Sequence, residues 1–145
     1  SVFNRIIRNR RLGRSTWVYI DEIYLLFQHE YSANFLFTLW KRVRKYGACC
    51  TGLTQNVDDL LQSHTARTML ANSEFLVMLN QASTDRAELA RLLNISDNQL
   101  SYITNVDFGR GLIKCGSAIV PFMDNFPKNH LYKLMSTKPA DLNAA

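Results

Sequence analysis

The stretch TWVYIDE, residues 16–22, decides the fold: an apolar run ends abruptly in two adjacent acids, Asp21 and Glu22. Its β-branched and aromatic residues favour a β-strand, and an uninterrupted apolar run is typical of a strand buried on both faces of a parallel sheet. Ligands of open α/β sheets bind at the carboxyl ends of the strands. The acids therefore mark a candidate binding site; the simpler alternative is a buried strand that exits to solvent through two charges.

The composition is that of an ordinary globular protein. Of 145 residues, 47% are hydrophobic and 20% are charged, which is enough for a hydrophobic core. The length predicts one domain or a piece of one, and no stretch approaches the ~20 apolar residues of a membrane span or shows a signal-peptide pattern. Cys49, Cys50 and Cys115 lack CxxC spacing, so we expect reduced thiols and neither a disulfide framework nor a zinc site.

The basic residues are unevenly placed and give the chain a net charge of +5. One cluster lies within the first 14 residues, where there is no acid, and a second occupies residues 41–45. Such clusters favour anionic partners: a nucleotide, nucleic acid, a membrane surface or an acidic face of another subunit. A solvated helix face is the simpler alternative for the first cluster. The nine cations are Arg5, Arg8, Arg10, Arg11, Arg14, Lys41, Arg42, Arg44 and Lys45.

Strand and helix patterns alternate along the chain, which predicts an α/β fold. We expect strands at residues 16–20, 48–54 and 75–79, the last also buried, and a β-hairpin formed by 110–115 and 118–123. Helices are expected over residues 2–12 (or an ordered arm), 22–29, 57–62, 65–72, 84–93 and 97–103. The tail, residues 126–145, contains two prolines and is expected to be irregular.

The clearest helix lies between the first two strands. Ser32 is its expected N-cap, Gly47 is well placed to end it, and one helical stripe carries its apolar side chains. That stripe consists of Phe35, Leu36, Leu39, Trp40 and Val43. Further along, Ser83 is the expected cap of helix 84–93, and Ser96 with Gln99 predicts a capping box for helix 97–103.

Three polar side chains are expected to meet at one edge of the predicted sheet. Asp21 and Glu22 follow the first strand, and Gln55 follows the second. If the two strands are parallel neighbours, their carboxyl ends lie at the same edge. An aspartate can hold the Mg²⁺ shell, a neighbouring glutamate can activate a water, and an amide can orient that water or sense a γ-phosphate. Gln55 alone would equally suit an ordinary strand end.

Four segments, taken in order, resemble the carboxyl-terminal part of the conjugative-transfer ATPases. These are the VirB-type energy subunits of type IV secretion systems, in the HerA–FtsK branch of P-loop NTPases. The resemblance covers about residues 15–125 and implies a partial RecA-like P-loop NTPase core, with parallel strands, flanking helices and a C-terminal β-hairpin. The segments are STWVYIDE, WKRVRKYGACCTGLTQNVDDLL, ARTMLANSEFLVMLNQ and GRGLIKCG.

The resemblance implies roles for individual residues. Asp21 and Glu22 match the family's Walker B acids, which coordinate magnesium (through water, for Asp21) and activate water. Gln55 matches the glutamine that senses the γ-phosphate. Arg44 resembles the arginine offered to a neighbouring subunit's nucleotide, and Arg67 is a weaker candidate for that role. The alternative for Arg44 is a cation that stabilises a helix C-terminus.

The phosphate-binding loop of these enzymes is missing. No G-x-x-x-x-G-K-[ST] motif occurs in the 145 residues, so we expect the fold to lack the Walker A strand and interpret the chain as a fragment. ATP and Mg²⁺ are expected in the full-length protein but not tightly bound here, because the Walker B acids alone repel an anionic nucleotide. We therefore expect no appreciable ATPase activity, and either a gap between strands 48–54 and 75–79 or their direct pairing.

The resemblance also implies partners and a location. It implies a hexameric ring in the full-length protein, contacts with other secretion-channel subunits, and a cytoplasmic position, peripheral at the inner face of a bacterial membrane. The basic clusters add non-specific contact with DNA.

Two other functions compete with the secretion ATPase. A DNA-translocating coupling ATPase would share the nucleotide chemistry and the basic clusters. The segment ELARLLNISDNQLSYI, residues 88–103, resembles a helix-turn-helix, whose second helix would enter the major groove of DNA. However, no Lys or Arg occurs between Arg91 and Arg110 to contact phosphates, which argues against that module.

Overall fold

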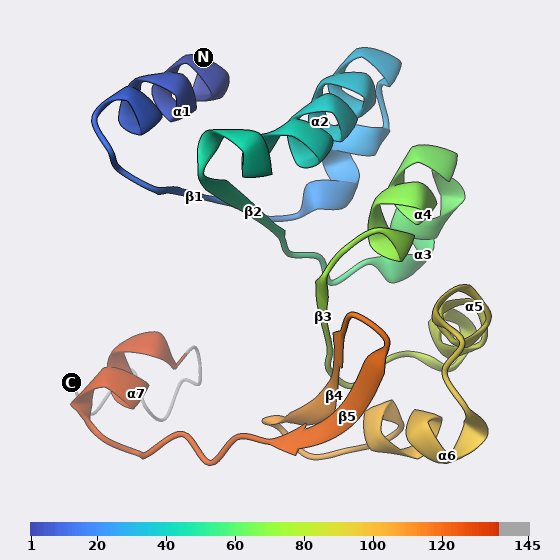
Figure 1. Ribbon diagram of the computed structural model, residues 1–145. Coiled ribbons are helices and arrows are strands. Elements are labelled where there is room, and N and C mark those ends of the chain that lie inside the picture. Colours follow the sequence, from blue (N-terminus) through green and yellow to red (C-terminus); the bar gives the residue numbers. More distant parts are fainter. Residues whose placement is uncertain (137–145) are drawn as a thin grey trace. The chain divides into compact units, whose positions relative to one another are not determined.

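The computed structural model describes residues 1–136, apart from the side chains of residues 83–85. The chain, for which the sequence predicted one domain or a fragment, divides into two compact units (Figure 1). The first unit comprises Ser1–Glu74 and Ser83–Ile95, and the second comprises Phe75–Ala82 and the residues from Ser96 onward. Each unit contains its own β-sheet.

The first unit is built around a two-stranded parallel sheet. β1 (Thr16–Ile20) pairs with β2 (Ala48–Gly52), and the connection between them is helical, as Figure 1 shows. Parallel pairing places the carboxyl ends of both strands at the same edge, which confirms the predicted α/β arrangement. The connection consists of η1 (Ile23–Phe27), α2 (Glu30–Arg42) and η2 (Val43–Tyr46).

Helices cover one face of this sheet with a single hydrophobic core. The alternate strand residues Val18, Ile20 and Cys50 pack against that core. The remaining helices of the unit are α1 (Val2–Arg11), α3 (Val57–Gln62), α4 (His64–Ala71) and α5 (Ser83–Leu93). The buried core residues are Ile6, Ile23, Leu36, Leu39, Val43, Ala48, Leu60, Ala66 and Met69.

The opposite face of β1 is exposed, so the prediction of a strand buried on both faces was wrong. Trp17 and Tyr19 are 64% and 68% exposed. Successive side chains of a strand point to opposite faces, and the core described above packs only on the side of Val18 and Ile20. Within residues 1–136, only one face of this apolar strand is therefore covered.

The main helix begins three residues earlier than predicted. α2 starts at Glu30 with His29 as its N-cap, and the Ser32 hydroxyl donates to the carbonyls of Leu26 and His29 instead of capping. A serine inside the first turn can donate its hydroxyl hydrogen to upstream carbonyls, so Ser32 is accommodated within the helix and does not mark its beginning. The end of the helical connection is as predicted, because Gly47 takes a left-handed conformation with φ 63°.

The second unit contains an antiparallel sheet of order β3-β4-β5. The predicted hairpin is confirmed: β4 (Arg110–Cys115) pairs with β5 (Ala118–Met123). β3 (Phe75–Met78) pairs with β4, not with β2, so the direct pairing of the second and third strands does not occur. Its predicted burial was wrong as well, since Phe75 and Val77 are 67% and 61% exposed.

Short helices complete the described chain. α6 (Asp97–Leu100) begins with the predicted capping box of Ser96 and Gln99 and continues into η3 (Ser101–Ile103). α7 (His130–Met135) lies in the tail that was expected to be irregular, so that expectation was wrong for this helix; residues 137–145 lie outside the described part. Between residues 1 and 136, no helix combines the length and hydrophobicity that crossing a membrane requires.

The segment that resembles a helix-turn-helix is divided between the two units. α5 belongs to the first unit and α6 to the second. α6 is only four residues long before it changes to a 3-10 helix. A recognition helix needs enough length to reach base edges in the groove, so this segment is poorly suited to reading DNA.

Candidate functional site

The two acids lie on a tight turn at the carboxyl end of β1. The Leu53 N–H donates to the Ile20 carbonyl at 2.8 Å, and the Ile23 N–H donates to the Leu53 carbonyl at 2.9 Å. Ile23 is buried and packs so closely on Gly52 that a Cβ there would lie 2.5 Å from Ile23 Cδ1. Backbone hydrogen bonds and core packing thus hold the turn against the segment that follows β2.

Glu22 has a strained backbone. Its φ of 46° and ψ of 50° place it in the left-handed region, which non-glycine residues seldom adopt. Its N–H donates to Asp21 Oδ1 at 3.0 Å. Such a conformation costs roughly 1–3 kcal/mol and persists only where the surrounding structure enforces it, which the Leu53 hydrogen bonds do here.

The Glu22 carboxylate is also incompletely paired. Its Oε2 atom is buried and has no hydrogen-bond partner among the described residues. A buried oxygen without a partner costs about 1–3 kcal/mol, so this atom is suited to accept from a water or to face a cation. With the exposed Asp21 beside it, the turn offers two hard oxygen ligands, and Mg²⁺ in proteins is usually held by one or two carboxylates with waters and phosphates. The donor set fits magnesium.

Gln55 lies at the same sheet edge, in the loop between β2 and α3. β2 ends at Gly52, two residues earlier than predicted, so Gln55 is exposed in a loop and does not end the strand. Thr54 Oγ1 accepts from the Asn56 N–H, and Asn56 Oδ1 accepts from the Asp59 N–H as the cap of α3. The residues on either side of Gln55 are therefore held, while no hydrogen bond joins its side chain to Asp21 or Glu22 in residues 1–136.

Arg44 is not brought to the acids of its own chain. It is exposed on η2, immediately before the amino end of β2, whereas the acids follow the carboxyl end of β1. The strands between these edges are five residues long, which corresponds to about 16 Å at roughly 3.3 Å per residue. An arginine side chain cannot span that distance through the sheet, so the predicted residues form two groups at opposite edges.

Arg67 is held within its own unit. Its Nη2 forms an ion pair with Glu88 Oε2 at 2.9 Å, and its Nε donates to the Leu61 carbonyl at 2.5 Å. These contacts join α4 to α5 and to the end of α3. Arg67 therefore has a structural role here and is a poorer candidate than the unpaired Arg44 for contacting a second molecule.

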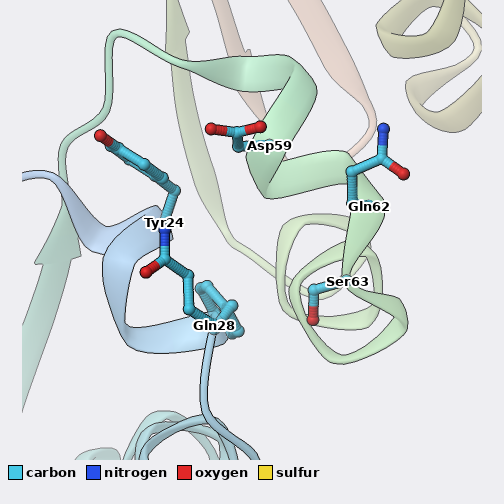
Figure 2. Close-up of a pocket in the computed structure, with 6 residues that line it drawn as sticks. Tyr24, Gln28, Asp59, Gln62 and Ser63 are labelled. Carbon is cyan, nitrogen blue, oxygen red and sulfur yellow. The ribbon is translucent and has the colours of Figure 1, made fainter.

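A shallow depression of about 300 Å³ lies beside the site and was not predicted. Figure 2 shows Tyr24 and Gln28 on one side of it and Asp59, Gln62 and Ser63 on the other. It forms where η1, which follows Glu22, packs against α3, which follows Gln55. No sequence pattern pointed to it, because its lining comes from two helices whose contact is tertiary.

Comparisons with known proteins show the family and the fold of this chain. The family model described as the TraG P-loop domain matches residues 2–110. Among solved structures, the chain is similar to VirB4 of Thermoanaerobacter pseudethanolicus, with a TM-score of 0.79 and 25% sequence identity. That match covers 90% of this chain but 36% of the other, so this chain spans about a third of the length of the VirB4 chain. No curated protein sequence matches it.

Proposed function

The chain belongs to the TraG P-loop domain family, and we propose that it forms the carboxyl-terminal half of an ATPase motor domain that energises conjugative DNA transfer or type IV secretion. Its α/β fold resembles that of VirB4, and both strand ends that would carry the nucleotide chemistry lie at one sheet edge. In this proposal the chain contributes the Walker B acids, the sensor glutamine and an arginine for a neighbouring subunit.

The observation that carries the proposal is the strained turn at Glu22. Two unfavourable features coincide at this residue, a left-handed backbone and a buried carboxylate oxygen without a partner. A general base needs a carboxylate oxygen that no protein donor occupies, and Glu22 Oε2 has no hydrogen-bond partner among the described residues, which supports this role. Asp21 would hold Mg²⁺ through water. When bound, the ion neutralises charge on the phosphates.

Gln55 and Arg44 complete the proposed set. The exposed Gln55 amide, at the same edge as the acids, would sense the γ-phosphate or orient the attacking water. Arg44 is exposed, forms no ion pair with any residue between 1 and 136, and lies at the far edge of the sheet. It would therefore act on the nucleotide of a neighbouring subunit, where its planar guanidinium stabilises developing charge.

The phosphate-binding loop would come from elsewhere in the intact protein. The 145 residues contain no such motif, so we propose that they do not hydrolyse ATP alone. Magnesium-dependent hydrolysis by the purified chain that disappears in Asp21→Ala would contradict this. We further propose that the intact protein forms a hexameric ring, contacts other secretion-channel subunits, and lies at the cytoplasmic face of a bacterial membrane.

The test of the proposed function is Glu22→Gln in the intact protein. Because the amide cannot take a proton, we expect kcat for ATP hydrolysis to fall by about 100-fold or more, while the affinity for ATP stays within about threefold. Phosphate release and binding of a fluorescent ATP analogue measure the two quantities.

The matched control is Glu30→Gln, which makes the same change of charge at an exposed glutamate that begins α2. It should leave both quantities unchanged. Hydrolysis by Glu22→Gln at the wild-type rate would remove Glu22 from the role of general base.

A further inference from the structure

The exposed Gln55 lies in a loop whose two flanking residues are hydrogen-bonded to each other. Thr54 Oγ1 accepts from the Asn56 N–H at 3.1 Å and donates to the Asn56 carbonyl, also at 3.1 Å. A threonine hydroxyl can act as donor and acceptor at once. Both flanking residues are half-buried, whereas Gln55 is exposed. The hydroxyl thus restricts the backbone from which the Gln55 side chain extends.

The Asn56 side chain joins this loop to α3 through both of its polar atoms. Its Oδ1 accepts from the Asp59 N–H at 3.1 Å as the N-cap of α3, and its Nδ2 donates to Asp59 Oδ2 at 2.6 Å. The second bond has an ionised acceptor, and such bonds are shorter and stronger than those between neutral groups. Only one orientation of the amide satisfies both contacts, so the plane of the Asn56 side chain is fixed. We call this pair of hydrogen bonds the Asn56–Asp59 clamp.

Both ends of the Gln55 loop are tied to the segment that carries Glu22. Before the loop, the Leu53 N–H donates to the Ile20 carbonyl, and the Leu53 carbonyl accepts from the Ile23 N–H. After the loop, α3 is anchored by its buried apolar residues and packs against η1, the helix that follows Glu22. The first tie is made by backbone groups alone. The second reaches Gln55 through the Asn56–Asp59 clamp, which is made by side chains.

We propose that Asn56 is a positioning residue, whose clamp on Asp59 holds the loop that presents the Gln55 amide to the nucleotide. The inference rests on the proposed function, since it takes Gln55 to orient the attacking water or to sense the γ-phosphate. Within residues 1–136 the Gln55 side chain is not bonded to either acid of the turn, so its backbone alone determines where the amide reaches. A misplacement of about 1 Å can lower a rate by up to about 100-fold. Asn56 itself touches neither the nucleotide nor the water and acts through Gln55.

The first test exchanges the two partners of the clamp in the intact protein. Asn56→Asp keeps the capping oxygen but places two carboxylates against each other, so we expect kcat for ATP hydrolysis to fall about tenfold while the affinity for ATP stays within about threefold. Asp59→Asn alone should stay near the wild type, because its amide oxygen still accepts from Asn56 Nδ2. The double variant Asn56→Asp/Asp59→Asn restores one donor and one acceptor in exchanged positions, and its kcat should return to within about twofold of the wild type.

The second test asks whether Asn56 acts through Gln55. Gln55→Ala should lower kcat by about tenfold to 100-fold and leave a measurable rate. In that background Asn56→Asp should lower kcat no further, because there is no amide left to position. A residue that supports only the fold would lower kcat by the same factor in both backgrounds. Phosphate release measures kcat, and binding of a fluorescent ATP analogue measures the affinity.

The matched control is Asn129→Asp, the same change at the asparagine that caps α7 by accepting from the Tyr132 N–H. It should leave both quantities unchanged. If Asn56→Asp does not fold, as judged by circular dichroism, Asn56→Gly replaces it, since glycine is a good N-cap that cannot form the clamp; the same loss of kcat is expected.

The outcomes separate this inference from the proposed function. Wild-type kcat in the Asn56 variants, no recovery in the exchanged pair, or a loss that persists beside Gln55→Ala would each overturn the positioning role alone. Hydrolysis by Gln55→Ala at the wild-type rate would remove Gln55 from the proposed function, and the inference would fall with it.

Discussion

At the scale of single residues, Glu22 is where local preference and tertiary structure disagree most. A glutamate gains nothing from a left-handed backbone, and a buried carboxylate oxygen gains nothing from lacking a partner. The two hydrogen bonds with Leu53 impose the turn, and Asp21 Oδ1 accepts the N–H that the turn exposes. Backbone strain and an unpaired buried oxygen at one residue are expected at functional sites, where residues lower the stability of the fold.

Replacing Glu22 with glycine should therefore stabilise the protein. Glycine adopts positive φ freely and removes the unpaired oxygen, so we expect Glu22→Gly to raise the free energy of unfolding by about 1 kcal/mol while abolishing any hydrolysis that depends on the carboxylate. Urea unfolding followed by circular dichroism measures the change. Asp21→Gly is the matched control, because Asp21 does not have a positive φ and its replacement should lower stability; a fall in both variants would show that strain at Glu22 is not relieved.

Cys50 gives a prediction for alkaline pH. Burial, and secondarily the neighbouring Cys49, raises the pKa of the Cys50 thiol from 9.0 to about 11. The folded state therefore keeps a proton that the unfolded state loses, so the stabilising contribution is complete below pH 9 and is lost as the pH rises towards 11. The difference in stability between wild type and Cys50→Ala should shrink over this range in urea titrations. A difference that stays constant from pH 8 to about 11 would contradict the raised pKa.

At the scale of secondary-structure elements, close packing between β2 and η1 sets the position of the acids. Gly52 lies against the Ile23 side chain, and the Ile23 N–H donates to the carbonyl of Leu53, the residue after Gly52. A side chain at residue 52 would push η1, and with it the Glu22 turn, away from β2. The glycine is thus required by a close approach of two elements and not by an unusual φ.

Gly52→Ala should lower the free energy of unfolding by about 1–3 kcal/mol, because the new Cβ would overlap Ile23 Cδ1. Ile23→Val removes that atom at a cost of about 0.5–1.5 kcal/mol by itself. In the double variant the loss should be clearly smaller than the sum of the two, which chemical unfolding of all four proteins measures. Additive losses would mean that other parts of the structure shift to relieve the overlap. As a control, Thr51→Ala on the exposed face should change stability by less than about 0.5 kcal/mol.

At the scale of the whole molecule, the two sheets each expose a row of large apolar side chains. Trp17 and Tyr19 on β1, and Phe75 and Val77 on β3, are more than half exposed. Parallel strands are normally covered on both faces, whereas residues 1–136 supply a core for only one face of the β1–β2 sheet. The chain spans about a third of the VirB4 chain that it matches, so the composition of these strands suits a larger domain than the one they form here.

The proposed role of Arg44 belongs to this scale as well, because it requires a neighbouring subunit. Arg44→Ala and Glu22→Gln should each abolish ATP hydrolysis by the intact protein while leaving ATP binding intact. When the two variants are mixed in equal amounts and form rings at random, about one site in four has an intact Glu22 from one subunit and an intact Arg44 from the next. Activity should therefore return to about a quarter of the wild-type value. Phosphate release after mixing measures the recovered activity. No recovery would place Arg44 in the site of its own subunit. The control variant Arg42→Ala should remain active.

Most of the architecture could be predicted from short-range patterns. The strand that ends at Ile20, the helix that contains Leu36 and Leu39, the stop at Gly47, the capping box at Ser96 and the hairpin all follow from local propensity and hydrophobic periodicity, as the structure confirms. The early start of α2 could not be predicted, since His29 at its N-cap makes no side-chain capping bond and Ser32 bonds to the Leu26 carbonyl six residues upstream.

The sequence was sufficient for the class of the protein and for the identity of its candidate site residues, because those depend on residue types in a fixed order along the chain. The sequence did not indicate that Arg44 lies at the opposite sheet edge from the acids, or that β1 is buried on one face and exposed on the other. Nor did it indicate the contact between α1 and η2, the helices that carry basic residues of the two clusters. Those properties depend on which elements pack together and at which edge of the sheet, and such contacts join residues whose separation in the chain carries no periodic signal. The two acids after β1 are thus predictable as a pair, while the strain and the unpaired oxygen of Glu22 arise from the backbone of Leu53 and the packing of Ile23 on Gly52.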